Sequence, residues 1–252
     1  MTVAPFPLFE GDAVENALLG GRVRLRQPAK GYRAGMDAAL LAAAVAAEPG
    51  QRVIEAGCGA GAVLMQIAAR RPGVSLTGLE RDPAMAALAR ENAALNGAEA
   101  QIVEGDVAAG FRALEMEPFD WAVSNPPFFD DPGALRAPAE GKRGAWMADD
   151  GLKAWTTFLL KSVREGGRIV VIHRADRLAD LLALLGETAG SFAVRGVHPY
   201  ADEPAKRVLV QAIKTGKAPL RLLPPLVLHD RSGAKHTAEA EAVLRGEAGL
   251  GF

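Results

Sequence analysis

The sequence has little cysteine, little net charge and no long apolar run. Its single cysteine, Cys58, excludes an intrachain disulfide framework and a metal site built from several cysteines. The 29 basic residues nearly balance the 30 acidic ones, so no general attraction to nucleic acid is visible, although a neutral total can hide a basic face. The apolar stretch Ala38 to Ala47 is too short to span a bilayer, and Met1 to Glu10 does not resemble a signal peptide. These absences predict a cytoplasmic protein.

The length of the chain and the absence of internal repeats predict one domain. A chain of 252 residues suffices for one large α/β domain with extensions, and no clear linker interrupts it. We expect a single domain over residues 1–252. Within it, residues 1–50 form an N-terminal extension with a short strand and a helix, 51–214 form the core, and 215–252 form a C-terminal extension.

A strand, a glycine-rich turn and a helix open the core. Arg52 to Ala56 reads as a buried strand that leads into Gly57-Cys58-Gly59-Ala60-Gly61, here called the glycine turn, and Ala62 to Arg70 follows as a helix. The next strand, Val74 to Leu79, ends in Glu80, an acid about twenty residues on that suits hydrogen bonds to ribose hydroxyls. This pattern is common to domains that bind NAD and domains that bind S-adenosylmethionine. Cys58 is expected to pack inside the turn.

A second motif distinguishes an NAD-binding domain from one that binds S-adenosylmethionine. Asn125-Pro126-Pro127-Phe128, here called the NPPF turn, directly follows an apolar strand-like run, Asp120 to Ser124. Two prolines fix a rigid corner and leave carbonyl groups without local donors. Such a corner can accept both hydrogens of a flat exocyclic amine while an aromatic ring lies against the attached base. An ordinary turn is the alternative. Because a dehydrogenase has no use for this arrangement, the motif favours S-adenosylmethionine.

The remaining elements follow in a regular order. Capping signals place a helix from Pro83 to about Leu95, with Asp82 as N-cap and a stop at Asn96-Gly97. Asp37 is a plausible N-cap for a helix over Ala38–Ala47. The polar stretch from Asp130 to Asp150 is typical of a lid or a binding loop. We further expect strands at Val23–Arg26, Ala100–Val103, Arg168–His173 and Leu226–Leu228, an antiparallel pair at Phe192–His198 and Arg207–Ile213, helices at Leu152–Arg164, Leu178–Leu185 and Ala238–Arg245, and a turn at Glu165–Gly167.

The order of these motifs resembles a known family. A glycine turn, an acid after the second strand, Asp106 after the third and the NPPF turn after the fourth resemble class I S-adenosylmethionine-dependent methyltransferases that modify exocyclic or side-chain amide nitrogens. The resemblance covers roughly Val53 to Ile213. It implies a Rossmann-like α/β fold, with a seven-stranded, mostly parallel sheet that carries a C-terminal antiparallel hairpin.

Two further segments resemble one branch of this class. Gln27 to Asp37, and the tail Leu228 to Asp230 with Glu239 to Leu244, are similar to bacterial tRNA1(Val) adenine-37 N6-methyltransferases. Phe128 departs from the tyrosine that adenine N6 enzymes often carry, and an NPPF ending is also common among guanine-N2 methyltransferases of ribosomal RNA.

The resemblance also implies the roles of the site residues. S-adenosylmethionine would be the cofactor, its methionine part lying against Glu55, Gly57, Gly59 and Gly61, its ribose against Glu80, and its adenine against Asp106 and Val107. Tyr32 and Arg33 could cap its carboxylate or touch a phosphate, or could be a packing residue and a surface charge. Asp106 could instead belong to a plain turn. The residues implied in catalysis are Asn125, Pro126, Pro127 and Phe128, with Asn125 also beside the cofactor.

The implied reaction methylates the N6 amine of adenine in RNA, A37 of a tRNA anticodon loop, without a metal. Lys142, Arg143 and Trp146 in the polar loop are candidate tRNA contacts, although a solvated loop would look the same. The alternatives are guanine-N2 methylation of ribosomal RNA, glutamine-N5 methylation of a protein, and a cofactor-binding module without catalysis. A monomer is favoured.

Overall fold

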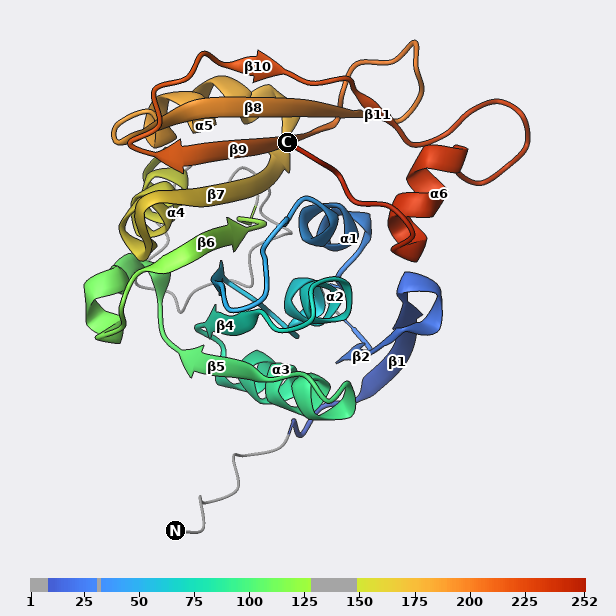
Figure 1. Ribbon diagram of the computed structural model, residues 1–252. Helices are drawn as coiled ribbons and strands as arrows, with labels where there is room; N and C mark the ends of the chain where they lie inside the picture. The colour runs from blue at the N-terminus through green and yellow to red at the C-terminus, as the bar shows by residue number, and fades with distance from the viewer. Residues whose placement is uncertain (1–8, 31–32, 128–148) are drawn as a thin grey trace, which may run out of the picture.

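The computed structural model describes residues 9–30, 33–127 and 149–252, and one large sheet with helices on both faces dominates it (Figure 1). The strand order is β10-β8-β9-β7-β6-β3-β4-β5, and β11 also pairs with β8. Strands β5, β4, β3, β6 and β7 are parallel, whereas β9 is antiparallel to both β7 and β8. The strands are β3 (Arg52–Ala56), β4 (Ser75–Glu80), β5 (Ala100–Glu104), β6 (Phe119–Ser124), β7 (Val163–Arg174), β8 (Ala189–His198), β9 (Arg207–Lys214), β10 (Arg221–Leu222) and β11 (Leu226–Val227).

The predicted sheet is confirmed for strands β3 to β9. These seven strands form the mostly parallel sheet with its C-terminal antiparallel hairpin, and two short strands, β10 and β11, extend it beside β8. Strand β11 is predicted from the sequence, whereas β10 is not. Alternate residues of the buried parallel strands face opposite cores, as Val53 and Ile54 of β3 do.

Helices cover the two faces of the sheet in separate groups. Buried residues of α1, α2, α3 and α6 pack in one core cluster, and those of α4 and α5 pack in the other (Figure 1). The helices are α1 (Met36–Ala43), α2 (Ala62–Arg70), α3 (Pro83–Leu95), α4 (Asp149–Ser162), α5 (Leu178–Leu185) and α6 (Ala238–Arg245). Within the described parts of the chain, no helix has the length and apolar character that a membrane crossing requires.

The predicted capping of two helices has different outcomes. Asp82 caps α3, because its carboxylate accepts from the backbone N–H of Ala84 at 2.9 Å. Asp37 does not cap α1: Gly35 is the N-cap residue, and the helix ends at Ala43 instead of Ala47. The carboxylate of Asp37 instead accepts from Arg207 Nε at 2.9 Å, at the start of β9.

The predicted turn at Glu165–Gly167 lies inside β7, where it interrupts the pairing with β6. Strand β7 begins at Val163 and runs through these residues, which form its irregular first part. Gly166 has a φ of +72°, and the register with β6 shifts between Phe119 and Trp121. Helix α4 accordingly ends at Ser162, two residues earlier than expected.

An N-terminal hairpin lies outside the large sheet. It pairs β1 (Ala13–Leu18) antiparallel with β2 (Val23–Pro28), and a short 3-10 helix, Leu19–Gly21, joins them. The sequence predicts β2 over Val23–Arg26 but gives no sign of β1. We refer to residues 13–28 as the N-terminal hairpin.

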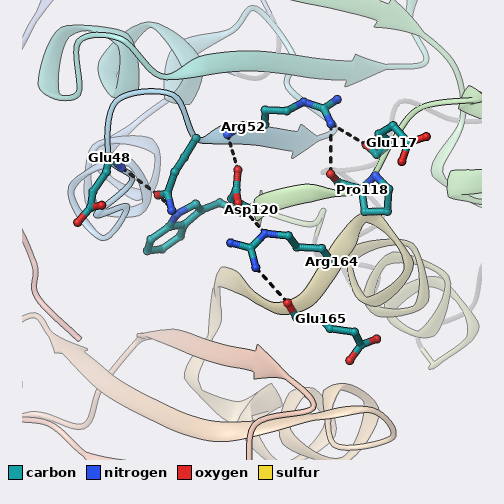
Figure 2. Close-up of polar contacts among 9 residues, drawn as sticks. Glu48, Arg52, Glu117, Pro118, Asp120, Arg164 and Glu165 are labelled. Atoms are coloured by element: carbon teal, nitrogen blue, oxygen red, sulfur yellow. Dashed lines mark hydrogen bonds and ion pairs between the residues drawn. The ribbon is translucent and has the colours of Figure 1, made fainter.

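Polar contacts fix the amino ends of β3, β6 and β7 relative to one another (Figure 2). The backbone N–H of Arg52 donates to Asp120 Oδ2 at 2.8 Å, and Arg164 Nε donates to Asp120 Oδ1 at 2.7 Å. The indole N–H of Trp121 donates to Gln51 Oε1 at 2.9 Å. These contacts hold β6 to both neighbouring strands at this end, and the pairing of Ser124 with Ala56 fixes its opposite end beside β3.

Candidate active site

The predicted site residues follow strands that end at one edge of the sheet. Pairing places Ala56 of β3 beside Leu79 of β4 and Ser124 of β6, and Glu80 beside Glu104 of β5. The chain passes from β3 to β4 on one side and returns to β6 on the other, so the strand order reverses at β3. Ligands of open α/β sheets bind in the crevice at such a reversal.

The glycine turn lies at this reversal. The backbone N–H groups of Gly57 and Cys58 both donate to the carbonyl of Leu79, at 2.8 and 3.0 Å, which holds the turn against the end of β4. Cys58 is buried, and it packs against Gly78, where a Cβ would come within 2.7 Å of the Cys58 Sγ atom. Burial raises the pKa of this thiol well above its usual value. Cys58 therefore packs inside the turn, as the sequence predicts.

Two glycines of the turn have positive φ angles but differ in the space that a side chain would find. Gly57 has a φ of +69°, and a Cβ there would lie 2.3 Å from the ring of Trp155 on α4. Gly59 has a φ of +54°, but a Cβ there would meet no described atom within 4 Å. Gly57 is thus closed in by packing, whereas Gly59 has open space beside it.

This difference predicts different effects on stability and on cofactor binding for two alanine substitutions. Gly57→Ala should lower the free energy of unfolding by roughly 2–5 kcal/mol, because it adds overpacking to the left-handed backbone cost. Gly59→Ala should cost only about 1–2 kcal/mol, because the backbone cost acts alone. It should nevertheless weaken cofactor binding more than tenfold, since its methyl group fills the open side of the turn. Chemical denaturation and calorimetric titration with S-adenosylmethionine measure the two effects. An equal loss of stability in both variants would contradict the packing difference.

Glu80 accepts two backbone hydrogen bonds at the end of β4. The N–H of Gly59 donates to Oε2 at 2.9 Å, and the N–H of Asp82 donates to Oε1 at 2.9 Å. These contacts orient the carboxylate between the glycine turn and the start of α3. A carboxylate held in this way, at the end of the second parallel strand of the unit, is suited to bind vicinal hydroxyl groups of a ribose.

Glu55 is a buried acid beneath the glycine turn. Its side chain is 3% exposed, and its Oε2 atom has no hydrogen-bond partner among the described residues. Burial, and then the negative charge of Glu80, raise the pKa of Glu55 well above its ordinary value of 4.5. A buried carboxylate with one unpaired oxygen is suited to a cationic ligand group. The predicted cofactor carries an ammonium group and a sulfonium centre, so this part of the site fits it.

The raised pKa of Glu55 predicts a pH-dependent stability. Because the folded-state pKa exceeds the unfolded one, the protonated form contributes stability that is complete below about pH 4.5 and is lost as pH rises through the folded-state pKa. Without cofactor, Glu55→Gln should therefore have a higher Tm than the natural protein at pH 8, and the difference should shrink toward pH 4.5. The same variant should bind the cofactor more weakly. Thermal denaturation across this pH range measures the first effect. Glu104→Gln, which alters an exposed carboxylate, is the control and should show no such trend.

Asp106 begins a short 3-10 helix directly after β5. Its Oδ1 atom accepts from the N–H of Ala108 at 2.9 Å, and Val107 beside it is buried. The same edge of the sheet therefore carries Asp106, Glu80 and the glycine turn. Arg33 lies beside the N-terminal hairpin, where its guanidinium donates to Asn16 Oδ1 at 2.7 Å. Tyr32 lies outside the described residues, and the cofactor roles of both residues stay predictions.

The NPPF turn starts where β6 ends. Ser124 is buried, and its hydroxyl donates to the carbonyl of Ala56 at 2.9 Å, which joins the ends of β6 and β3. Asn125 and Pro127 are half-buried and Pro126 is buried. Asn125 is therefore held at the reversal of strand order, next to the glycine turn. Outside the described residues lie the remaining predicted contacts, Phe128, Lys142, Arg143 and Trp146.

One residue of this region is not predicted from the sequence. Trp155 is nearly buried and its ring packs on Gly57, so it forms a wall of the glycine turn. In the sequence, Trp155 occupies one of the apolar positions of a predicted helix, as an ordinary core residue does. Only the three-dimensional contact separates it from the other core aromatics.

Two histidines at strand ends make structural hydrogen bonds. His173 Nδ1 accepts from the N–H of Arg174 at 2.8 Å, and His198 Nδ1 lies 2.7 Å from the carbonyl of Glu203. Burial, and then the positive charges of Arg177 and Arg174, lower the pKa of His173 to about 4. A histidine that stays neutral at physiological pH and is held in this way is unsuited to carry a positive charge in a binding site.

Comparison with known proteins identifies relatives of this chain. Residues 33–137 match the methyltransferase small domain family. The chain is 40% identical over 147 residues to a release factor glutamine methyltransferase from Deinococcus radiodurans, with 55% of the chain and 51% of that relative covered. It thus spans about half of that relative's length. It is also 28% identical over 195 residues to a tRNA1(Val) (adenine(37)-N6)-methyltransferase from Dickeya chrysanthemi, with 76% of each covered.

A solved structure matches nearly the whole fold. The crystal structure of a predicted O-methyltransferase from Agrobacterium tumefaciens superimposes with a TM-score of 0.70 at 29% identity. The superposition covers 86% of this chain and 99% of that one. The overall fold of the chain therefore matches one that is established by experiment.

Proposed function

By its domain and its fold the chain is a class I S-adenosylmethionine-dependent methyltransferase, and from this premise we propose that it methylates the exocyclic N6 amine of adenine in RNA, at A37 of a tRNA anticodon loop. The observation that carries the proposal is the position of Asn125, which directly follows β6 at the reversal of strand order, beside the glycine turn. An acceptor amine held by Asn125 would lie next to a cofactor held by that turn.

The chemistry of an exocyclic amine explains what Asn125 contributes. S-adenosylmethionine supplies an electrophilic methyl group on a positively charged sulfur. The lone pair of the amine is delocalised into the purine ring, so the amine must be oriented and its nitrogen must become tetrahedral. Asn125 Oδ1 and the carbonyl of Pro126 accept the two amine hydrogens. These contacts strengthen as positive charge develops on the nitrogen, so they favour the transition state over the ground state.

The substrate must present an unstacked base to this turn. Phe128 directly follows the two prolines, and stacking of a base on an aromatic side chain contributes roughly 1–3 kcal/mol. Bases in a single-stranded loop reach such a pocket at the smallest cost in lost stacking. The relative from Dickeya chrysanthemi, named for adenine 37 of a tRNA, supports an anticodon loop as that substrate. A tRNA substrate would also place the enzyme in the cytoplasm.

Protein glutamine-N5 methylation is the second candidate. The relative from Deinococcus radiodurans, named for this activity, is the more identical of the two over the aligned part. A glutamine side-chain amide offers the same two hydrogens to Asn125 and Pro126. The NPPF turn therefore supports transfer to a planar nitrogen, and the RNA assignment depends on the tRNA relative and on Phe128.

The experiment that tests the proposal identifies the methylated group. The protein is incubated with methyl-labelled S-adenosylmethionine and tRNA from cells that lack its gene, and the tRNA is digested to nucleosides. We expect N6-methyladenosine as the labelled product. An anticodon stem-loop with 2-aminopurine at position 37, which has its amine at C2 only, should not be labelled. N2-methylguanosine in the digest would overturn the adenine assignment. In a parallel incubation that supplies a release factor, label in that protein but in no RNA would favour the glutamine candidate.

A further inference from the structure

Two asparagines of α3 hold the N-terminal hairpin. Asn92 Oδ1 accepts from the N–H of Arg26 at 2.8 Å, and Asn92 Nδ2 donates to the carbonyl of Arg26 at 2.8 Å. Asn96 makes the same pair of contacts with Arg24, at 2.9 and 2.7 Å. Four residues of helix rise about 6 Å and two residues of strand span a little more, so the two amides match alternate residues of β2. They occupy the place that a neighbouring strand would take.

Only one of the two amides also reaches the cofactor site. Asn92 Nδ2 donates a second hydrogen bond, at 2.9 Å, to the carbonyl of Ala60 in the glycine turn. Asn92 is 0% exposed, so this contact is shielded from water. The second bond of Asn96 Nδ2 goes to the carbonyl of Asn92 within α3, at 2.7 Å. Asn92 is therefore bonded to β2 and to the glycine turn together, whereas Asn96 is bonded to β2 and its own helix.

The hairpin in turn positions the segment that leads into α1. Gln27, the residue after Arg26, is buried, and its Oε1 atom accepts from the N–H of Ala34 at 2.6 Å. Its Nε2 atom donates to Asn16 Oδ1 at 3.1 Å. The contacts of Asn92 thus extend through β2 to residue 34, two residues before α1 begins.

We propose that Asn92 is a positioning residue that couples cofactor binding at the glycine turn to docking of the N-terminal hairpin. The inference rests on the cofactor site of the proposed function and not on the identity of the methyl acceptor. A buried carbonyl that loses its donor is costly, so without the Asn92 amide the turn around Ala60 relaxes toward other partners. A turn of altered shape presents its N–H groups differently to the cofactor. Conversely, a cofactor that fixes the turn also fixes Asn92 and with it β2.

A matched pair of variants separates this coupling from general destabilisation. Asn92→Ala and Asn96→Ala each remove one amide that holds β2, and only the first removes the bond to Ala60. We expect Asn92→Ala to raise the Kd for S-adenosylmethionine about tenfold or more, and Asn96→Ala to change it less than about twofold. Titration calorimetry, at a temperature well below both Tm values, measures the difference. Equal changes of Kd in the two variants, or none in Asn92→Ala, would overturn the proposal.

Hydrogen exchange gives a second readout, which begins with the natural protein. Saturating S-adenosylmethionine should slow exchange of the amides of Arg24 and Arg26 about tenfold, although neither residue belongs to the predicted cofactor site. Each variant leaves one of these amides with its own acceptor, so the slowing should persist at Arg26 in Asn96→Ala and be lost at Arg24 in Asn92→Ala. Unchanged exchange on cofactor binding would contradict the coupling even if Asn92→Ala failed to fold. Neither readout uses a methyl acceptor, so a failed RNA assay with these results intact would overturn the substrate assignment alone.

Discussion

Replacing Asn125 by alanine is expected to lower the rate of methyl transfer by about two to three orders of magnitude, with the Kd for S-adenosylmethionine within about threefold of the natural value. Asn125 follows β6 at the strand reversal, and its Oδ1 atom is the proposed acceptor for one amine hydrogen. This contact strengthens as the nitrogen becomes tetrahedral and positive, so its loss acts on kcat more than on ground-state binding. Single-turnover assays with saturating cofactor and an anticodon stem-loop measure the rate.

Two control variants separate an acceptor role from a structural one. Asn125→Asp keeps an oxygen at the acceptor position and should recover part of the rate that alanine loses. Ser124→Ala removes the hydroxyl that donates to the carbonyl of Ala56, one residue away, and should lower Tm with a smaller effect on kcat. If Asn125→Ala raised the Kd for the cofactor as much as it lowered the rate, weaker cofactor binding would account for the whole loss and the proposed amine contact would be wrong.

Replacing Glu80 by alanine is expected to raise the Kd for S-adenosylmethionine about a hundredfold or more. Hydrogen bonds to a charged group contribute about 1.5–3 kcal/mol each, and a hundredfold change corresponds to about 2.8 kcal/mol. The variant would lose the two proposed ribose contacts. It would also lose the acceptor that holds the N–H groups of Gly59 and Asp82. Calorimetric titration measures the affinity.

Glu104→Gln is the matched control for Glu80. Glu104 lies opposite Glu80 on the neighbouring strand and forms an ion pair with Arg90 at 2.8 Å, with its side chain 43% exposed. Exposed ion pairs contribute little, so this variant should bind the cofactor with nearly the natural affinity. A similar loss of affinity in both variants would assign the effect to negative charge along this edge of the sheet, and not to ribose contacts of Glu80.

Local signals in the sequence predict the elements around the site well. Helix α3 has the predicted bounds, because the signals that start and stop it are adjacent to it in the sequence: Asp82 caps its start and Asn96-Gly97 ends it. Strand β3, the glycine turn and α2 are equally local, since a buried apolar run, three glycines and a helical period follow one another directly. Glu80, Asp106 and Asn125 each follow a strand of the parallel sheet, so they lie at the same edge of that sheet.

The sequence-based predictions fail at residues whose partners are distant in the sequence. Asp37 has the side chain of an N-cap, but its carboxylate pairs with Arg207, which no local pattern reveals. Strand β1 lacks a clear alternation of apolar and polar residues, and it is a strand because it pairs with β2. Asn92 reads in the sequence as one more polar position of a helix. A pair of asparagines four residues apart on α3 is the only local signal of its role, and that signal alone names no partner.

The strand order of the sheet has a consequence for synthesis on the ribosome. Strand β3 pairs with β4 on one side and with β6 on the other, but β6 begins only at Phe119. About sixty residues separate β3 from β6, and at roughly 5–20 residues per second they take about 3–12 s to appear. During this interval the nascent chain can already pair β3, β4 and β5, while the second edge of β3 has no strand beside it. An open edge of an apolar strand favours pairing with other chains. The interval before β6 emerges is therefore one in which the growing chain is open to such pairing.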